Sequence, residues 1–348
     1  MNPLRSKRLY EGKGRTLADR GQEMPLFKAP ENPPQDYYPD ENLRDAVHVA
    51  LTLGMPLLLT GEPGTGKTEL ARSLAWELFG DRPLEFHTKS TSTYTDLFYQ
   101  YDALRHFRDI QVEAAAKQAG TAGEMRNTAT ENYITWGPFG EAILRAMNRE
   151  AANLPATYRG QKQRRSVVLI DELDKAPRDL PNDILNEIER MEFSVKELPP
   201  DRNKFSAEQA YRPILILTSN LEKDLPQAFR RRCVFYHIDF KDLDLREIIR
   251  RRLRKDPEFT EPMLNAALEH FRAIRQRNLE KTPATAELLA WLELLQRLRL
   301  DVKDVVALDD QGKVALAASY ALLAKSDEDL RSLRESVLGK GTPEAPAL

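Results

Sequence analysis

The chain has 348 residues, of which 30% are charged and 41% are hydrophobic. This length and composition predict about two globular domains and exclude a largely disordered chain or a small disulfide-stapled protein. The net charge of −2 gives no general positive field that would attract nucleic acid, and the single cysteine, Cys233, cannot form a bridge within the chain. The charged start MNPLRSKRLYEGKGR lacks the apolar segment of a secretory signal, and no apolar run reaches the roughly 18 residues of a membrane span. We therefore expect a cytoplasmic protein without a membrane span.

The first elements follow from the periodicity of apolar residues. Residues 1–36 mix charges with prolines and show no sustained period, which predicts an extended N-terminal arm. A helix is expected from Asn42, then a buried strand over residues 55–60, a helix over 67–79 and a strand over 84–88. Further helices are predicted over 140–153 and 180–191, and further strands over 166–171 and 214–218.

Two irregular stretches, 99–135 and 198–211, interrupt the alternation of strands and helices and are predicted to be insertions. From about residue 241 the pattern is helical. We therefore expect an α/β domain over residues 37–240, a helical domain over 241–335 and a tail over 336–348. The continuous apolar runs VVLI and ILIL favour a parallel sheet that helices cover on both faces.

The strongest chemical signal is GEPGTGKT at positions 61–68, which matches G-x-x-x-x-G-K-[ST] in full between a predicted strand and a predicted helix. In such a loop the backbone N–H groups surround phosphate oxygens, and the helix N-terminus adds a positive dipole. Lys67 would reach the outer phosphates, and the Thr68 hydroxyl would bind Mg²⁺. A glycine-rich turn that only caps a helix is the alternative, which the register of strand, motif and helix disfavours. The residues expected to bind the nucleotide are Gly61, Glu62, Pro63, Gly64, Thr65, Gly66, Lys67, Thr68 and Glu69.

Two acids, Asp171 and Glu172, follow the buried run VVLI at the end of a predicted strand, where ligands bind in open α/β sheets. Asp171 is expected to hold Mg²⁺, and Glu172 to polarise a water for attack on the γ-phosphorus. Taken alone, two acids after a strand more often cap a helix or face solvent. The phosphate-binding motif earlier in the chain favours the catalytic interpretation.

Asn220 follows the next predicted strand and is a candidate to orient the attacking water beside Glu172, with a turn cap as the alternative. The triple arginine at 230–232 lies between two apolar segments, LPQAF and CVF. Such a run is usually a solvated face, but Arg231 or Arg232 could complete a nucleotide site on a neighbouring subunit as an arginine finger.

The chain carries the motifs GEPGTGKT, VVLIDE, TSN and LPQAFRRRC in this order. This set of motifs resembles that of the AAA+ ATPases, and within them that of the MoxR family. The words LLLTGEPGTGKT, LIDELDKAP, PNDILNEIE and RRCVFYHIDF are similar to its CoxD-like members, and the resemblance covers residues 40 to about 300. It implies a P-loop NTPase fold of the α/β class, with a five-stranded parallel core, two hairpin insertions and a C-terminal helical lid domain. It also implies a homo-oligomeric ring, usually a hexamer, whose sites lie at subunit interfaces.

The resemblance further implies ATP hydrolysis that depends on Mg²⁺ and drives chaperone-like remodelling or maturation of a partner complex, for example metal or cofactor insertion. A von Willebrand factor A domain protein or a target enzyme complex is the implied partner. A nucleic-acid-directed motor is an alternative, which the balanced charge and the lack of a DNA-binding module disfavour. A scaffold that binds ATP only to assemble is another, which the intact Glu172 and Asn220 disfavour.

The resemblance also assigns roles to single residues. Lys67 and Thr68 match the Walker A pair, Asp171 and Glu172 match the Walker B pair, and Asn220 matches sensor 1.

Two positions depart from the pattern of the family. Its finger motif usually reads LPEAxLDRF, so Arg232 aligns with its arginine and Arg231 replaces its acid. Its sensor 2 arginine lies within a Ser-Pro-Arg word, where this chain has Lys281-Thr282-Pro283. Lys281 is thus a candidate to supply that charge to the nucleotide as a point cation, and a solvated lysine at a helix start is the alternative.

Overall fold

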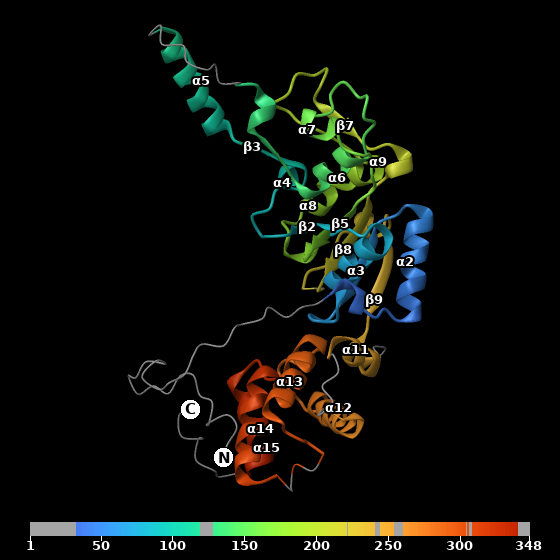
Figure 1. Cartoon of the computed structure of the whole chain (residues 1–348), viewed down its shortest axis with the longest axis vertical. Helices are drawn as coiled ribbons and strands as arrows, with labels where there is room; N and C mark the ends of the chain where they lie inside the picture. Colours follow the sequence, from blue (N-terminus) through green and yellow to red (C-terminus); the bar gives the residue numbers. More distant parts are fainter. Residues whose placement is uncertain are drawn as a thin grey trace. The chain divides into compact units, whose positions relative to one another are not determined.

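The computed structural model describes residues 33–118, 128–220, 222–240, 244–253, 260–303, 305 and 308–339 (Figure 1). Most of the predicted arm and most of the predicted C-terminal tail lie outside these residues. The chain divides into two compact units. The larger holds the described residues of Pro39–Glu62 and Gly66–Asp242, and the smaller holds those of Leu243–Leu348 with Pro63–Thr65 and the described end of Met1–Tyr38. Among the described helices, none is long and apolar enough to cross a membrane.

The larger unit is built on a five-stranded parallel sheet with the order β2-β5-β8-β1-β9. The strands are β1 (Leu57–Gly61), β2 (Leu84–His87), β5 (Val167–Asp171), β8 (Ile214–Ser219) and β9 (Val234–Ile238). Every residue of β1 and β5 is buried, as expected for inner strands that helices cover on both faces. The predicted P-loop NTPase fold with a five-stranded parallel core is confirmed.

The register of the sheet brings three strand ends together. Thr60 of β1 pairs with Ser219 of β8, and Ile170 of β5 pairs with Leu217 of β8. Because the strands are parallel, the loops that leave β1, β5 and β8 emerge at the same edge of the sheet. The phosphate-binding motif, the two acids and Asn220 are therefore neighbours.

Helices alternate with the strands along the chain in this unit. They are α2 (Glu41–Leu53), α3 (Lys67–Phe79), α4 (Tyr94–Phe98), α6 (Pro138–Ala146), α7 (Ala156–Arg159), α8 (Leu180–Asp183), α9 (Leu185–Arg190) and α10 (Gln227–Arg230). The helix predicted over 67–79 has those bounds and ends at Gly80 in the left-handed conformation. Two other predicted helices are shorter: α6 ends at Ala146, and the stretch 180–191 is interrupted at Ile184, which links α8 to α9.

Both predicted insertions form antiparallel hairpins. The first pairs β3 (Tyr99–Tyr101) with β4 (Ile134–Trp136), and α5 (Ala103–Gln118) lies between them in the chain. The second pairs β6 (Glu192–Ser194) with β7 (Lys204–Ser206), so it begins before the predicted residue 198. The rings of Phe193 and Phe205 stack, and Trp136 packs edge-on against both. This aromatic cluster joins the two hairpins.

The smaller unit is helical, as expected. Its helices are α11 (Leu245–Arg252), α12 (Glu261–Arg275), α13 (Thr285–Leu298), α14 (Asp310–Ser319) and α15 (Asp327–Leu338). The core contains the fully buried rings of Phe271, Trp291 and Tyr320. The Trp291 indole donates a hydrogen bond to Ser319 Oγ at 2.8 Å, so its buried N–H is satisfied. The 3-10 turn Pro34–Asp36 belongs to this unit.

Candidate active site

Two glycines of the loop between β1 and α3 have a left-handed backbone conformation. Gly64 and Gly66 have φ values of 79° and 92°, which residues with a Cβ atom rarely adopt. Gly66 is also the N-cap of α3 and makes no side-chain cap. The first N–H groups of α3 therefore have no capping side chain, which leaves a positive helix end for an anion.

Lys67 begins α3 and is buried, with 6% of its surface exposed. Its Nζ donates hydrogen bonds to the carbonyl oxygens of Gly61 and Glu62, both at 2.9 Å. Burial lowers the pKa of Lys67 from 10.5 to about 8, although nearby acids, Asp171 first among them, oppose this shift. An ammonium has three protons to donate, so one remains for a further acceptor.

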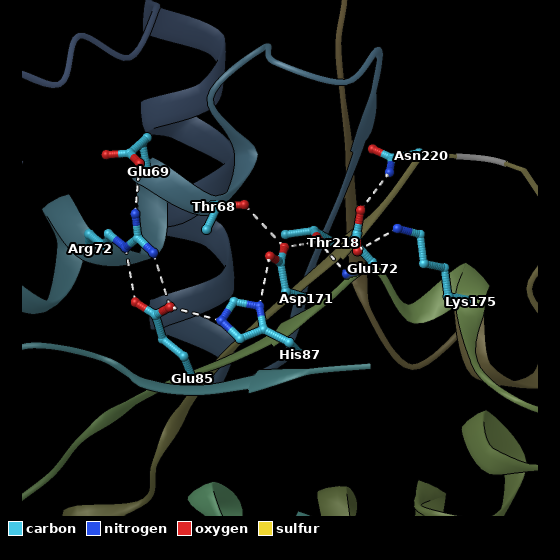
Figure 2. A network of polar contacts seen from close by, with 10 residues as sticks. All are labelled: Thr68, Glu69, Arg72, Glu85, His87, Asp171, Glu172, Lys175, Thr218 and Asn220. Atoms are coloured by element: carbon cyan, nitrogen blue, oxygen red, sulfur yellow. Dashed lines mark hydrogen bonds and ion pairs between the residues drawn. The ribbon is translucent and has the colours of Figure 1, made fainter. Parts of the chain in front are cut away.

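Thr68 and Asp171, the expected Mg²⁺ ligands, are in contact. Thr68 Oγ1 donates to Asp171 Oδ1 at 3.1 Å (Figure 2). The other carboxylate oxygen, Oδ2, lies 3.3 Å from His87 Nδ1 at the end of β2. A carboxylate and a hydroxyl are the oxygen ligands that Mg²⁺ prefers.

Glu172 lies in the turn after β5 with a left-handed φ of 56°. Its side chain is 37% exposed, and Oε2 accepts a hydrogen bond from Lys175 Nζ at 2.7 Å. Its other oxygen, Oε1, lies 3.4 Å from the amide nitrogen of Asn220 (Figure 2). The structure thus places Asn220 beside Glu172, and the ion pair with Glu172 raises the pKa of Lys175.

Thr218 connects both acids, although the sequence analysis gave it no role. Its hydroxyl donates to Asp171 Oδ1 at 2.6 Å and accepts the backbone N–H of Glu172 at 2.9 Å. Thr218 is 1% exposed. A signal was present in the sequence: Thr218 is the last residue of the predicted strand 214–218 and comes two residues before Asn220, at the strand end where the site was expected.

Asp174 is a second residue that the sequence analysis missed. It is 2% exposed and accepts the backbone N–H groups of Asn220, at 3.2 Å, and Glu222, at 3.1 Å. This carboxylate therefore ties the loop after β8 to the turn that carries Glu172.

Asp171 is linked through His87 to a network of charged side chains formed by Glu85, Arg72 and Glu69. Arg72 donates two hydrogen bonds to Glu85, at 2.9 and 3.0 Å, and a third to Glu69 at 2.9 Å (Figure 2). These bonds raise the pKa of Arg72 and lower that of Glu85. The carboxylate of Glu69, a residue expected to bind the nucleotide, faces this arginine. His87 Nε2 lies 3.4 Å from Glu85 and completes the network.

The two candidate arginines lie after α10. Arg232 donates to Glu189 and, at 3.1 Å, to the carbonyl oxygen of Ala228. Arg231 is exposed and makes no side-chain hydrogen bond or ion pair with the residues that the structure describes. Within the same residues, no hydrogen bond or ion pair joins either arginine to Asp171 or Glu172.

Lys281 belongs to the smaller unit and precedes α13. Its side chain is exposed, and its backbone N–H lies 3.5 Å from Asp329 Oδ2. Asp329 is 5% exposed and also accepts the N–H of Glu280 at 3.1 Å. The backbone at Lys281 is therefore anchored, while the ammonium faces solvent.

Comparison with known proteins finds one family model that matches the part of the sequence containing most of these residues. The family model of the AAA domain, dynein-related subfamily, matches residues 56–233, which include β1, the phosphate-binding loop, the two acids and both candidate arginines. A similar solved structure models the complex between subunits BchI and BchD of magnesium chelatase, based on a cryo-EM reconstruction. It is 14% identical, covers 87% of this chain and 99% of that chain, and has a TM-score of 0.39. No curated protein matches the sequence.

Proposed function

Because this chain belongs to the AAA domain family, in its dynein-related subfamily, we propose that it binds ATP with Mg²⁺ and hydrolyses it at the shared edge of β1, β5 and β8. One observation supports this proposal above the others. The buried Lys67, the Thr68 hydroxyl and the carboxylates of Asp171 and Glu172, which are brought together from separate segments, all lie at that edge.

The residues of the site fit a magnesium nucleotide. Lys67 and the uncapped N-terminus of α3 offer positive charge and N–H donors to phosphate oxygens. Thr68 and Asp171 would hold the metal, since their oxygen atoms already face one another. When bound, Mg²⁺ neutralises phosphate charge and polarises the phosphoryl group.

Glu172 is proposed to hold the attacking water and to accept its proton at a carboxylate oxygen. Asn220 would orient the same water, because its amide lies 3.4 Å from Glu172 Oε1. Lys175 Nζ holds Oε2 of Glu172 at 2.7 Å, so that Oε1 is the carboxylate oxygen that lies beside Asn220.

We propose that the site is completed by a neighbouring subunit through Arg231 or Arg232. Arg232 aligns with the arginine of the family motif, but its guanidinium binds Glu189 and Ala228 within the same chain. Arg231 has no such bonds among the described residues, which makes it the stronger candidate to reach a neighbour. Lys281 is proposed to add a point charge to the nucleotide, since its exposed ammonium is carried on an anchored backbone.

We further propose that the assembly is a MoxR-like ring, hexameric as is usual in that family, which acts in the cytoplasm. It would drive remodelling or maturation of a partner protein complex, with a von Willebrand factor A domain protein as the expected partner. The sequence words shared with the MoxR family, the two hairpins and the helical unit support this proposal.

The experiment that tests these proposals is ATPase activity per subunit over a wide dilution series with Mg²⁺. Activity that falls on dilution indicates sites shared between subunits. Arg231→Ala and Arg232→Ala are measured beside Arg230→Ala, a control that removes a neighbouring exposed arginine. We expect one of the first two to bind ATP without hydrolysing it and the control to stay active. Binding of ATP without hydrolysis by the wild type at every concentration would refute the proposed ATPase and favour a scaffold.

A further inference from the structure

We propose that Thr218 is a positioning residue of this site: its hydroxyl fixes the carboxylate of Asp171 and the backbone of Glu172, so that one acid faces the metal and the other faces the water. This inference rests on the proposed ATPase function. It assigns a role to a residue outside the loop, the acids and the arginines that the sequence motifs identify.

The hydrogen-bonding capacity of the Thr218 hydroxyl matches its two partners. A hydroxyl has one proton to donate, and this proton goes to Asp171 Oδ1 at 2.6 Å. Its oxygen accepts the N–H of Glu172 at 2.9 Å. With 1% of Thr218 exposed, water has no access to replace either bond. Both bonds therefore depend on this side chain.

The second bond supports an unfavourable backbone conformation. Glu172 has a φ of 56°, which is strained for a residue with a side chain and persists only where the surroundings impose it. The N–H of Glu172 is held by Thr218, and its carbonyl oxygen accepts the N–H of Lys175 at 2.9 Å. This turn makes the consecutive acids diverge: Asp171 faces Thr68, and Glu172 faces Asn220 (Figure 2).

The first bond holds the carboxylate that would bind the metal. Asp171 Oδ1 accepts from both Thr218 and Thr68, and Oδ2 lies beside His87. Thr218 belongs to β8, an inner strand, whereas His87 ends the edge strand β2. Thr218 is thus the more rigid support. Groups that orient a metal ligand typically contribute about 10- to 100-fold to metal affinity or activity.

The test compares Thr218→Val, which keeps the shape and loses the hydroxyl, with Thr218→Ser, which keeps the hydroxyl and loses a methyl group. We expect Thr218→Val to lower kcat by about 10- to 100-fold and to raise the Mg²⁺ concentration for half-maximal activity. Its affinity for ATP without Mg²⁺ should stay at the wild-type value. Thr218→Ser should keep most of the wild-type kcat. Thr60→Val, which removes an equally buried hydroxyl bonded to His237, is the control and should leave the Mg²⁺ dependence unchanged.

Two outcomes would overturn the inference. One is a Thr218→Val variant with the kcat and Mg²⁺ dependence of the wild type; the other is a Thr218→Ser variant that loses as much as Thr218→Val. If Thr218→Val does not fold, Thr218→Cys replaces it, because a thiol is only a weak donor and acceptor. The cysteine variant should then show reduced kcat and a raised Mg²⁺ requirement, and wild-type values would contradict the proposal.

The failure of the proposed function can be distinguished from the failure of this inference. If the wild type hydrolyses no ATP, the ATPase proposal fails by itself. The role of Thr218 is then read from the tightening of binding of a fluorescent ATP analogue by Mg²⁺. That tightening should occur at similar Mg²⁺ concentrations in the wild type and in Thr218→Ser, and should require about 10- to 100-fold more Mg²⁺ in Thr218→Val. Equal tightening in all three would overturn the inference.

Discussion

Raising the pH from 7 to 9 is expected to weaken ATP binding about tenfold, because Lys67 loses its charge in the free protein. Its pKa of about 8 means that about half of the unliganded molecules carry the ammonium at pH 8 and about one in eleven at pH 9. Bound phosphates favour the ammonium, so binding above pH 8 requires the uptake of a proton. The apparent Kd should therefore rise roughly twofold at pH 8 and roughly elevenfold at pH 9, relative to its value at low pH.

The same rise in pH that weakens ATP binding is expected to increase the free energy of unfolding. Lys67 has a pKa near 10.5 when unfolded and about 8 when folded, so between these values the unfolded chain binds the additional proton. The free energy of unfolding consequently increases with pH across this window, by about 1.4 kcal/mol per pH unit from this group. Weaker binding at pH 9 would therefore not arise from loss of stability at Lys67.

The assay is the Kd of a fluorescent ATP analogue at pH 7, 8 and 9, together with proton uptake measured by calorimetry in buffers of different ionisation enthalpy. Lys67→Arg is the matched control, because a guanidinium stays charged throughout this range and should give a flat pH profile. The reasoning is refuted if the wild type binds with the same affinity at pH 7 and 9 and takes up no proton.

Three further predictions concern other parts of the chain. Glu172→Gln should lower kcat by about 10²- to 10⁴-fold and leave ATP binding intact, which single-turnover and binding assays would measure. An unchanged turnover would show that Glu172 does not activate the attacking water. Gly140→Ala should lower the free energy of unfolding by about 3 kcal/mol, measured by urea unfolding, because the added Cβ would lie 2.0 Å from the carbonyl oxygen of Phe98. Gly160→Ala is the control: a Cβ at this position would have no atom within 4 Å, so its stability should be close to that of the wild type. Burial is the main cause that lowers the pKa of His270 from 6.5 to about 4. Between these two pH values the unfolded chain therefore binds one more proton than the folded chain. The free energy of unfolding should consequently fall by about 1.4 kcal/mol for each unit by which the pH is lowered through this range. His270→Gln should flatten that slope, and an equal slope in wild type and variant would contradict the assignment.

The elements that were predicted well are those whose signals are local. The helix Lys67–Phe79 has an apolar face of regular period and a glycine at its end, and both are properties of adjacent residues. The stretch 180–191 also has helical periodicity, yet it is interrupted at Ile184 and ends at Met191 in the left-handed conformation. Phe193, which follows at once, packs in the aromatic cluster with Phe205, so tertiary packing rather than local period decides where this helix ends.

The same distinction separates the site residues that the sequence identified from those that it missed. The lysine, the hydroxyl and the acids belong to short motifs, so their chemistry is visible in the sequence without knowledge of the fold. Thr218 and Asp174 act across 47 and 46 residues, through bonds that exist only when β5 and β8 are adjacent and in the observed register.

That register makes the position of Thr218 a consequence of strand pairing. Ile170 pairs with Leu217, so Asp171 and Thr218 are the next residues along the two strands, and their side chains leave the sheet at the same level. A shift of one residue would bring Leu217 or Ser219 to this place and would turn the neighbouring side chains to the opposite face. The apolar residues of β5 and β8, which are buried on both faces, therefore do more than form a core. By fixing the register, they determine which hydroxyl meets the carboxylate that would hold the metal.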